Sequence, residues 1–241
     1  MEKISRIRSR ISTVSSIVVL TGAGISADSG VPTFRGEDGL WRRFRAEDLA
    51  TPEAFRRDPV LVWEWYNWRR EIIAIKNPNA AHHALVKLER QARSFTLITQ
   101  NVDGLHAKAG SKNITEIHGN IWKTRCTVCG DVSHNFDVPI TILPHCKKCN
   151  GLLRPHIVWF GESLDPADIK RSMDAMHTCE VLLVIGTSGI VQPAASFVST
   201  AKGAGAYVVE INIEETPNSY LVDEVLVGRA SDVVPLLINR D

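Results

Sequence analysis

The sequence lacks a charge excess of either sign. Its 28 lysines and arginines stand against 27 aspartates and glutamates, so the formal net charge is +1. A nucleic-acid-binding protein normally carries a basic excess or a basic stripe. The balance therefore argues against direct nucleic-acid binding, and also against a polybasic membrane anchor.

Long hydrophobic runs are also missing. The apolar stretch from Ile17 to Leu20 ends at Thr21, whereas a helix that spans a bilayer needs about 20 apolar residues. No membrane association is therefore expected. There are five cysteines, and four of them form two tight pairs, which favours a metal site in a reducing compartment over a disulfide framework. These features predict a cytoplasmic protein.

The first sixteen residues allow two interpretations. They are rich in arginine and serine and hold a single acid, which is the composition of a mitochondrial transit peptide. Their apolar residues nevertheless recur at intervals of three and four, as in a buried helix stripe: Ile4, Ile7, Ile11 and Val14. We expect an ordinary first helix that leads into a strand.

Strand and helix patterns alternate along most of the chain. Short runs that are mostly apolar throughout indicate strands buried on both faces, at residues 17–20, 95–98, 181–185, 207–211 and 225–227. Helical spacing or capping residues mark segments between them, for example 80–90, 165–177 and 193–202. This alternation predicts an α/β fold with a Rossmann-like, doubly wound parallel sheet.

Two segments break the alternation. Residues 36–76 have little strand character and several tryptophans, so we expect a helical insertion. Residues 125–152 hold four cysteines and several turn residues, so we expect a small zinc-binding module. Together they would form a small domain beside a Rossmann-like domain made of residues 1–35, 77–124 and 153–241.

The two cysteine pairs are the most specific local signal. Cys126-x-x-Cys129 and Cys146-x-x-Cys149 are separated by sixteen residues, which is the spacing of two knuckles that close a tetrahedral zinc site. Four protein ligands leave no position for water or substrate, so the predicted zinc ion is structural. The fifth cysteine, Cys179, is expected to be a buried free thiol.

A glycine-rich turn follows the first predicted strand. The run from Gly22 to Ala27 fits G-x-G-x-x-A, in which backbone amides approach a pyrophosphate at a helix N-terminus; the alternative is a plain strand-to-helix turn. The acid that a dehydrogenase places some 20 residues later follows no strand here. Asn212 and Glu214, just beyond the strand 207–211, are candidates for the ribose contact, unless they form only a polar loop.

Polar residues also follow two other predicted strands. Gln100, Asn101 and Asp103 come after the strand 95–98, and the turn 186–189 comes after the strand 181–185. Because ligands bind at the carboxyl edge of open parallel sheets, both turns are candidate nucleotide contacts. His118 lies further on, and its spacing alone is compatible with either a structural or a catalytic histidine.

Taken together and in this order, several motifs resemble those of sirtuins, the NAD-dependent protein-lysine deacylases: GAGISADSGVPTFR, TQNVDGLH, EIHGN, the two CxxC pairs, VWFGE and GTSGIVQPA. The resemblance covers nearly the whole chain. It implies that NAD and acylated lysine side chains of proteins meet in a cleft between the two domains. The products would be nicotinamide and acyl-ADP-ribose, and one zinc ion would be structural. Gly189, Gln192 and His156 depart from commoner family forms.

The resemblance also implies roles for individual residues. His118 would be the general base, with Asn101 and Asp103 completing the catalytic set. The substrate backbone would add as a strand alongside residues that follow the cysteine module: Val158, Trp159, Phe160, Gly161 and Glu162. The implied cofactor set comprises Gly22, Ala23, Gly24, Ser26, Asp28, Pro32, Phe34, Arg35, Trp41, Gln100, Asn101, Asp103, Gly186, Thr187, Ser188, Asn212, Glu214 and Ala230.

An aromatic segment bears on which acyl group is removed. Tyr66 and Arg69 are three residues apart on a predicted helix, so their hydroxyl and guanidinium can converge on a carboxylate; the alternative is a helix face that merely packs. Together with Ala50 and Trp159, this pair resembles the sirtuin subgroup that removes succinyl, malonyl or glutaryl groups. The resemblance implies desuccinylation and demalonylation, with deacetylation weaker.

Three other functions stay open at this point. The chain could be a plain lysine deacetylase, or a protein ADP-ribosyltransferase that uses the same pocket. It could also be a zinc-ribbon adaptor that binds acylated tails or ADP-ribose without turnover, although the joint presence of His118, Asn101 and Asp103 argues against that.

Overall fold

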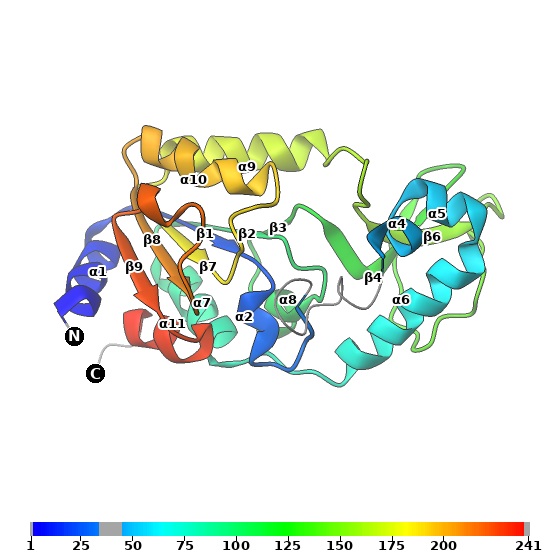
Figure 1. The fold of residues 1–241 in the computed structure, drawn as a ribbon, viewed down its shortest axis with the longest axis horizontal. Helices are drawn as coiled ribbons and strands as arrows, with labels where there is room; N and C mark the ends of the chain where they lie inside the picture. Colours follow the sequence, from blue (N-terminus) through cyan, green and yellow to red (C-terminus); the bar gives the residue numbers. More distant parts are fainter. Residues whose placement is uncertain (1, 34–44, 239–241) are drawn as a thin grey trace.

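The computed structural model describes residues 2–33 and 45–238. Its larger part is built on a six-stranded sheet in the order β3-β2-β1-β7-β8-β9, in which every neighbouring pair is parallel (Figure 1). The chain extends the sheet first to one side of β1 and then to the other, so the strand order reverses between β1 and β7. This is the order of doubly wound dinucleotide-binding domains, and it confirms the predicted fold class.

The strands of this sheet begin and end close to the predicted apolar runs. Their bounds are β1 (Ser16–Thr21), β2 (Ser94–Thr99), β3 (Ile114–Glu116), β7 (Val181–Ile185), β8 (Tyr207–Asn212) and β9 (Glu224–Val227). The short edge strand β3 was not predicted, because its sequence Ile-Thr-Glu contains no apolar run.

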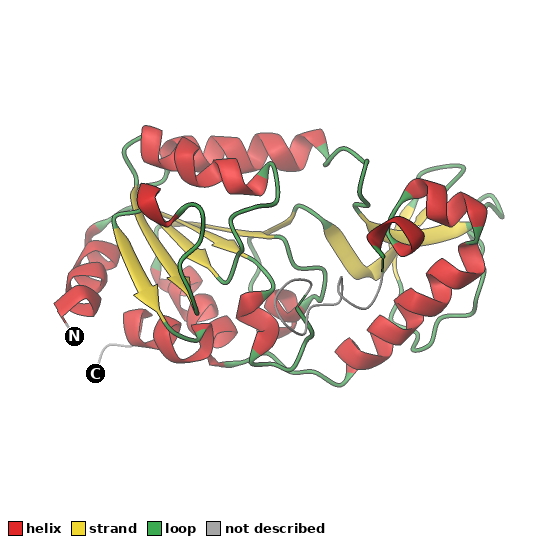
Figure 2. Cartoon of the chain, viewed as in Figure 1, coloured by secondary structure: helices red, strands yellow, loops and turns green. Residues whose placement is uncertain are grey.

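Helices cover both faces of the large sheet (Figure 2). One face packs against α1 (Glu2–Thr13), α2 (Gly24–Ala27), α7 (Ala80–Gln91) and α11 (Ala230–Ile238). The other face packs against α9 (Pro166–Thr178) and α10 (Ala194–Gly203). The first helix is present as expected, and Ile7 of its apolar stripe is fully buried. Two short helices, α8 (Leu105–Ala109) and η1 (Ser219–Leu221), lie in connections.

A smaller part of the molecule contains a second sheet. Its strands are antiparallel in the order β5-β4-β6, with β4 (Gly119–Cys126), β5 (Val132–His134) and β6 (Leu153–Ile157). Three helices share a core with this sheet: α4 (Ala46–Leu49), α5 (Pro52–Arg57) and α6 (Pro59–Ala74). Trp63 and Tyr66 of α6 are buried in that core with Ile121 and Ile157 of the sheet.

The second sheet joins chain that the sequence analysis divides between two domains. Strand β4 runs past residue 124, where a boundary was predicted, and pairs with β6, which begins at the next predicted boundary. These strands could not be predicted from the sequence because they lack continuous apolar runs. The exact division into domains stays a prediction. Among the described helices, none combines the length and the hydropathy that crossing a membrane requires.

Candidate functional site

Two glycine-containing turns meet at the carboxyl edge of the large sheet. Gly24 N donates to Gly186 O at 2.8 Å, and a Cβ atom on Gly24 would lie 2.7 Å from Gly186 Cα. Gly186 also has a φ of +60°, which favours glycine. A side chain at either position would force apart the turns that follow β1 and β7. The turns therefore meet where the strand order reverses, which is the usual position of a ligand crevice in open α/β sheets.

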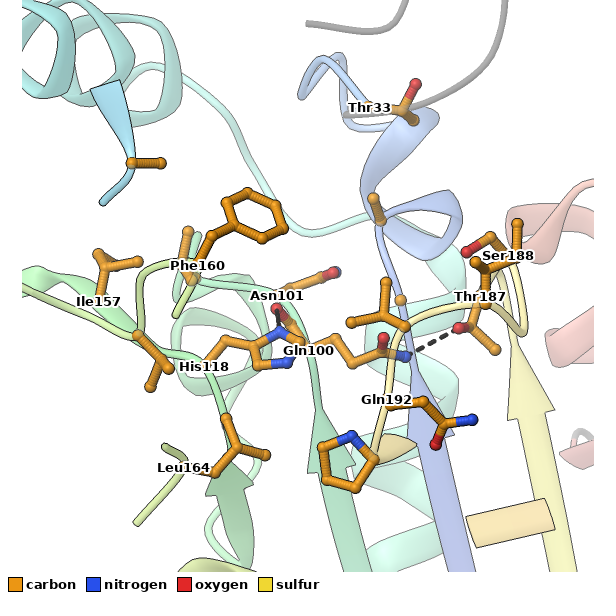
Figure 3. A pocket seen from close by; sticks show the side chains of 18 of the residues that line it. Thr33, Gln100, Asn101, His118, Ile157, Phe160, Leu164, Thr187, Ser188 and Gln192 are labelled. Carbon is orange, nitrogen blue, oxygen red and sulfur yellow. Dashed lines mark hydrogen bonds between the residues drawn. The ribbon is translucent and has the colours of Figure 1, made fainter. Parts of the chain in front are cut away.

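A cavity of about 1020 Å³ opens at this edge and reaches the smaller part of the molecule. Its volume lies at the upper end of the range for small-molecule sites. Nineteen of the predicted site residues line it: Gly22, Ala23, Gly24, Ala50, Tyr66, Arg69, Gln100, Asn101, His118, Val158, Trp159, Phe160, Gly161, Glu162, Gly186, Thr187, Ser188, Asn212 and Glu214. Figure 3 shows polar and apolar members of this set around one space.

Other predicted site residues do not line the cavity. Ser26 and Asp103 are buried behind its wall, and Ala230 packs in the core of the large sheet. Asp28 accepts hydrogen bonds from Arg229 and Ser231. Pro32 borders a separate small hollow beside α6. Phe34, Arg35 and Trp41 lie outside the described residues.

The imidazole of His118 has a defined tautomer. Its Nδ1 atom lies 3.1 Å from the backbone oxygen of Gln100. A carbonyl only accepts hydrogen bonds, so Nδ1 carries the proton and Nε2 holds a lone pair. Burial lowers the pKa of His118, which keeps the ring neutral near pH 7. The side chain lines the cavity (Figure 3), so it presents a proton acceptor there.

Hydrogen bonds join the ends of three strands at the cavity floor. The Gln100 side-chain amide, after β2, donates to Thr187 Oγ1, after β7, at 2.8 Å (Figure 3). Asn212, at the end of β8, donates from Nδ2 to the Thr187 backbone oxygen at 2.9 Å. The structure thus brings together residues that the sequence places 112 positions apart, from Gln100 to Asn212.

Asn101 and Asp103 are held by the short turn between β2 and α8. Asn101 Nδ2 donates to Ser26 Oγ at 3.2 Å. Asp103 Oδ1 accepts from the backbone N of Leu105 at 2.8 Å, which fixes the start of α8. Burial raises the pKa of Asp103, against the opposing effects of hydrogen bonds from Leu105 and Ser26 and of the Arg69 charge.

Sequence reasoning missed two buried histidines behind this wall. His82 Nε2 lies 3.5 Å from Ser26 Oγ, and burial lowers the pKa of His82 to about 4. The His82 ring lies 4.8 Å from that of His106 on α8, measured between centroids. His106 belongs to the TQNVDGLH motif but had no assigned role. The capping signal at Asn79, three residues before His82, shows where α7 begins but not what the histidine contacts.

Tyr66 and Arg69 share one face of α6, lie close to each other and both line the cavity. The helix starts where Asp58 accepts from Leu61 N and Pro59 occupies the first turn, as is usual at helix N-termini. Both side chains are buried, at 1% and 5% exposure. Burial raises the pKa of Tyr66 and lowers that of Arg69. A guanidinium stays protonated near pH 7 despite such burial.

Trp159 holds the hydroxyl of Tyr66. Its indole Nε1 donates to Tyr66 Oη at 2.8 Å. Arg154, which the sequence analysis did not single out, lies over the Trp159 ring with its guanidinium carbon 3.4 Å from the ring centroid. Arg154 also makes two hydrogen bonds to the Glu162 carboxylate, at 2.6 and 2.9 Å. These contacts fix the segment 158–162 beside α6.

The four predicted zinc ligands gather at the end of the second sheet. All four Sγ atoms lie within 4.8 Å of one another, with Cys126 and Cys149 at 3.5 Å and Cys129 and Cys146 at 3.8 Å. A tetrahedron with Zn–S bonds of about 2.3 Å places its sulfur atoms about 3.8 Å apart. The thiolate set therefore fits zinc, and it lies apart from the cavity, whose lining contains no cysteine among the described residues.

Comparisons with known proteins agree with this geometry. The model of the Sir2 family matches residues 22–193. An NAD-dependent protein deacylase of Aquifex aeolicus is 54% identical over 217 residues, which cover 90% of this chain and 91% of the relative. The NAD-dependent protein deacylase sirtuin-5, mitochondrial, of Danio rerio is 44% identical over 265 residues, covering 98% and 87%. A Sir2 homologue solved as an NAD complex superposes with a TM-score of 0.91, at 46% identity and with 97% and 92% of the chains covered.

Proposed function

The chain belongs to the Sir2 family, and from this premise we propose that it removes acidic acyl groups, succinyl and malonyl, from protein lysines in preference to acetyl. The broader activity is that of an NAD-dependent protein deacylase, with NAD as co-substrate and a four-cysteine site for structural zinc. The acyl preference, the roles of individual residues and the cytoplasmic location are proposals.

One observation carries the acyl preference: two buried hydrogen-bond donors lie close to each other and both line the cavity. The Tyr66 oxygen already accepts the indole N–H of Trp159, so the phenol's own proton is directed to another acceptor. The Arg69 guanidinium lies on the same helix face, 6.0 Å from the Tyr66 ring centroid. A carboxylate only accepts hydrogen bonds and carries the opposite charge, so it suits both groups.

The expected size of the preference follows from this chemistry. A hydrogen bond to a charged group contributes about 1.5 to 3 kcal/mol, which corresponds to roughly tenfold to a hundredfold in discrimination. Ala50, which also lines the cavity, has a small side chain that leaves room for a longer acyl group. An acetyl group offers no carboxylate, so we expect it to be a weaker substrate.

The position of each residue supports the remaining proposed roles. NAD supplies the nicotinamide that leaves and the ribose that receives the acyl group. His118 Nε2 would accept a proton from a ribose hydroxyl, and a lowered pKa supports this role at neutral pH. Gln100, Thr187 and Asn212 would hold the nucleotide at the sheet edge. The substrate backbone would lie along residues 158–162.

A direct assay tests the proposal. Peptides of one sequence that carry acetyl-, succinyl- or malonyl-lysine are mixed with protein and NAD, and released nicotinamide is followed by chromatography. We expect higher kcat/KM for the succinyl and malonyl peptides. Equal or higher kcat/KM for the acetyl peptide would contradict the acyl preference. Labelled NAD added without peptide distinguishes the alternative function, since ADP-ribosyl transfer would leave label on protein.

A further inference from the structure

We infer that His106 is a positioning residue that fixes Asn101 in the cavity through two threonines. His106 lies on α8, is 3% exposed and does not line the cavity, so the proposed function assigns it no role. The inference rests on the proposed part of Asn101 in NAD binding.

A continuous chain of hydrogen bonds leads from His106 to Asn101. His106 Nε2 lies 3.0 Å from Thr21 Oγ1. Thr21 Oγ1 donates to Thr99 Oγ1 at 2.8 Å, and Thr99 Oγ1 accepts from the backbone N of Asn101 at 3.0 Å. The two threonines are register partners at the carboxyl ends of β1 and β2. This series of hydrogen bonds therefore crosses directly beneath the sheet edge where the cavity opens.

The direction of these hydrogen bonds defines what the imidazole supplies. Burial, and secondarily His82, lower the pKa of His106 well below its usual value, so the ring is neutral. The Thr21 hydroxyl proton points to Thr99. His106 Nε2 must therefore donate its own proton to Thr21, and Nδ1 is left with a lone pair.

That arrangement costs stability. Nδ1 of His106 is buried, and no hydrogen-bond partner for it exists among the described residues. A buried polar atom without a partner lowers the stability of the folded state. An apolar side chain of similar size would avoid this cost, so packing alone does not explain an imidazole here. The N–H that the ring directs toward Thr21 explains why an imidazole is present.

The position of Asn101 has two consequences at the site. Its side chain lines the cavity and is held by Ser26, while its backbone is held by Thr99. The preceding residue, Gln100, carries the carbonyl that sets the His118 tautomer. If His106 no longer donates, the Thr21 hydroxyl can rotate and the turn after β2 loses one of its supports. The effect should appear in kcat/KM for NAD rather than in the KM for acyl-peptide.

Three variants test the inference. His106→Leu removes the donor, Thr21→Val removes the hydroxyl with little change of shape, and His106→Gln keeps a side-chain N–H. We expect kcat/KM for NAD to fall roughly tenfold or more in the first two, because small misplacements at a site are costly. His106→Gln should recover most of that loss, and the KM for acyl-peptide should stay within about twofold of wild type in all three.

Non-additivity shows that the two residues act together. The double variant Thr21→Val/His106→Leu should be no worse than the poorer single variant, as expected for members of one network. Ser172→Ala is the matched control, because Ser172 is fully buried on α9 with its hydroxyl unpaired within the described chain. It should leave kcat/KM for NAD unchanged. Thermal midpoints of all variants separate lost stability from lost positioning.

Two results would overturn the inference. His106→Leu and Thr21→Val that lower only the thermal midpoint, with wild-type kcat/KM for NAD, would make His106 purely structural. Asn101→Ala separates the proposed role of Asn101 from that of His106. If Asn101→Ala lowers kcat/KM for NAD while the His106 and Thr21 variants do not, only the positioning role of His106 is wrong. If Asn101→Ala leaves NAD kinetics unchanged, the proposed role of Asn101 fails first.

Discussion

The indole nitrogen of Trp159 donates to the hydroxyl oxygen of Tyr66 at 2.8 Å, and both side chains are buried. This contact joins the segment that would line the substrate backbone to the helix that carries Arg69. The orientation of the Tyr66 phenol in the cavity wall is therefore set by a hydrogen bond between two parts of the chain.

Replacing the indole should change selectivity more than activity. Trp159→Phe keeps an aromatic ring over Arg154 but removes the donor to Tyr66, so the phenol can turn away from the acyl group. We expect kcat/KM for a succinyl peptide to fall several-fold, because a neutral hydrogen bond contributes about 1 kcal/mol. The acetyl peptide should be nearly unaffected. Equal losses for both peptides would show that Trp159 acts only in packing.

Removing the guanidinium should affect only acidic acyl groups. Arg69→Met retains most of the length of the side chain but not its charge. The KM for succinyl-lysine peptide should rise about tenfold to a hundredfold, while the KM for acetyl-lysine peptide changes little. Arg56→Met, at an exposed position on α5, is the control for loss of a positive charge. A uniform effect of Arg69→Met on both peptides would contradict a contact with the acyl carboxylate.

The histidine base predicts a pH profile. Burial lowers the pKa of His118, and the proposed base would act in its neutral form. The kcat/KM should therefore rise with pH through a midpoint below the ordinary histidine value of about 6.5 and be level above it. His118→Gln should abolish turnover without loss of zinc or thermal stability. A rising limb centred above pH 7 would not fit this assignment.

The buried His82 should make stability depend on pH. Its folded-state pKa is about 4, below the value of about 6.5 in an unfolded chain. The unfolded state thus binds more protons between these values, so stability is intact above pH 6.5 and falls as the pH drops toward 4. The loss from this residue should be about 2 kcal/mol at pH 5.

Urea unfolding at pH 7 and pH 5 measures this effect. Carboxylates titrate in the same window, so the quantity to compare is the difference between wild type and His82→Gln. The variant should lose less stability on acidification than the wild type. The same loss in both proteins would mean that His82 is already protonated in the folded state at pH 5.

Zinc should stabilise the second sheet rather than take part in chemistry. Cys129→Ser removes one of four thiolates, so we expect loss of bound zinc and a lower thermal midpoint, because metal affinity contributes to the folding of such modules. Zinc content by atomic absorption and calorimetry would check this. A variant that binds no zinc yet melts like the wild type would show that the cysteine cluster is not a structural metal site.

Much of this molecule follows from patterns that are local in sequence. The apolar runs of β1 and β7 locate strands buried on both faces, and the cysteine spacing locates a metal site. What escaped prediction depends on partners distant in the chain. Arg154 is one of 28 basic residues until β6 places it over Trp159, and His106 is an ordinary helix residue until β1 brings Thr21 beside it. Strands β4 and β6 were missed because they lack continuous apolar runs and owe their burial to α6, and β5 because it is short and exposed.

Strand β4 begins at Gly119, directly after the proposed base, and ends at Cys126, the first of the four thiolates. Eight residues of extended chain thus connect the two sites, and the hydrogen bond from Val158 to the His118 carbonyl fastens the near end. We therefore expect oxidants or chelators that react with the distant thiolates to lower turnover without entering the cavity, because they would loosen strand β4, which begins directly after His118.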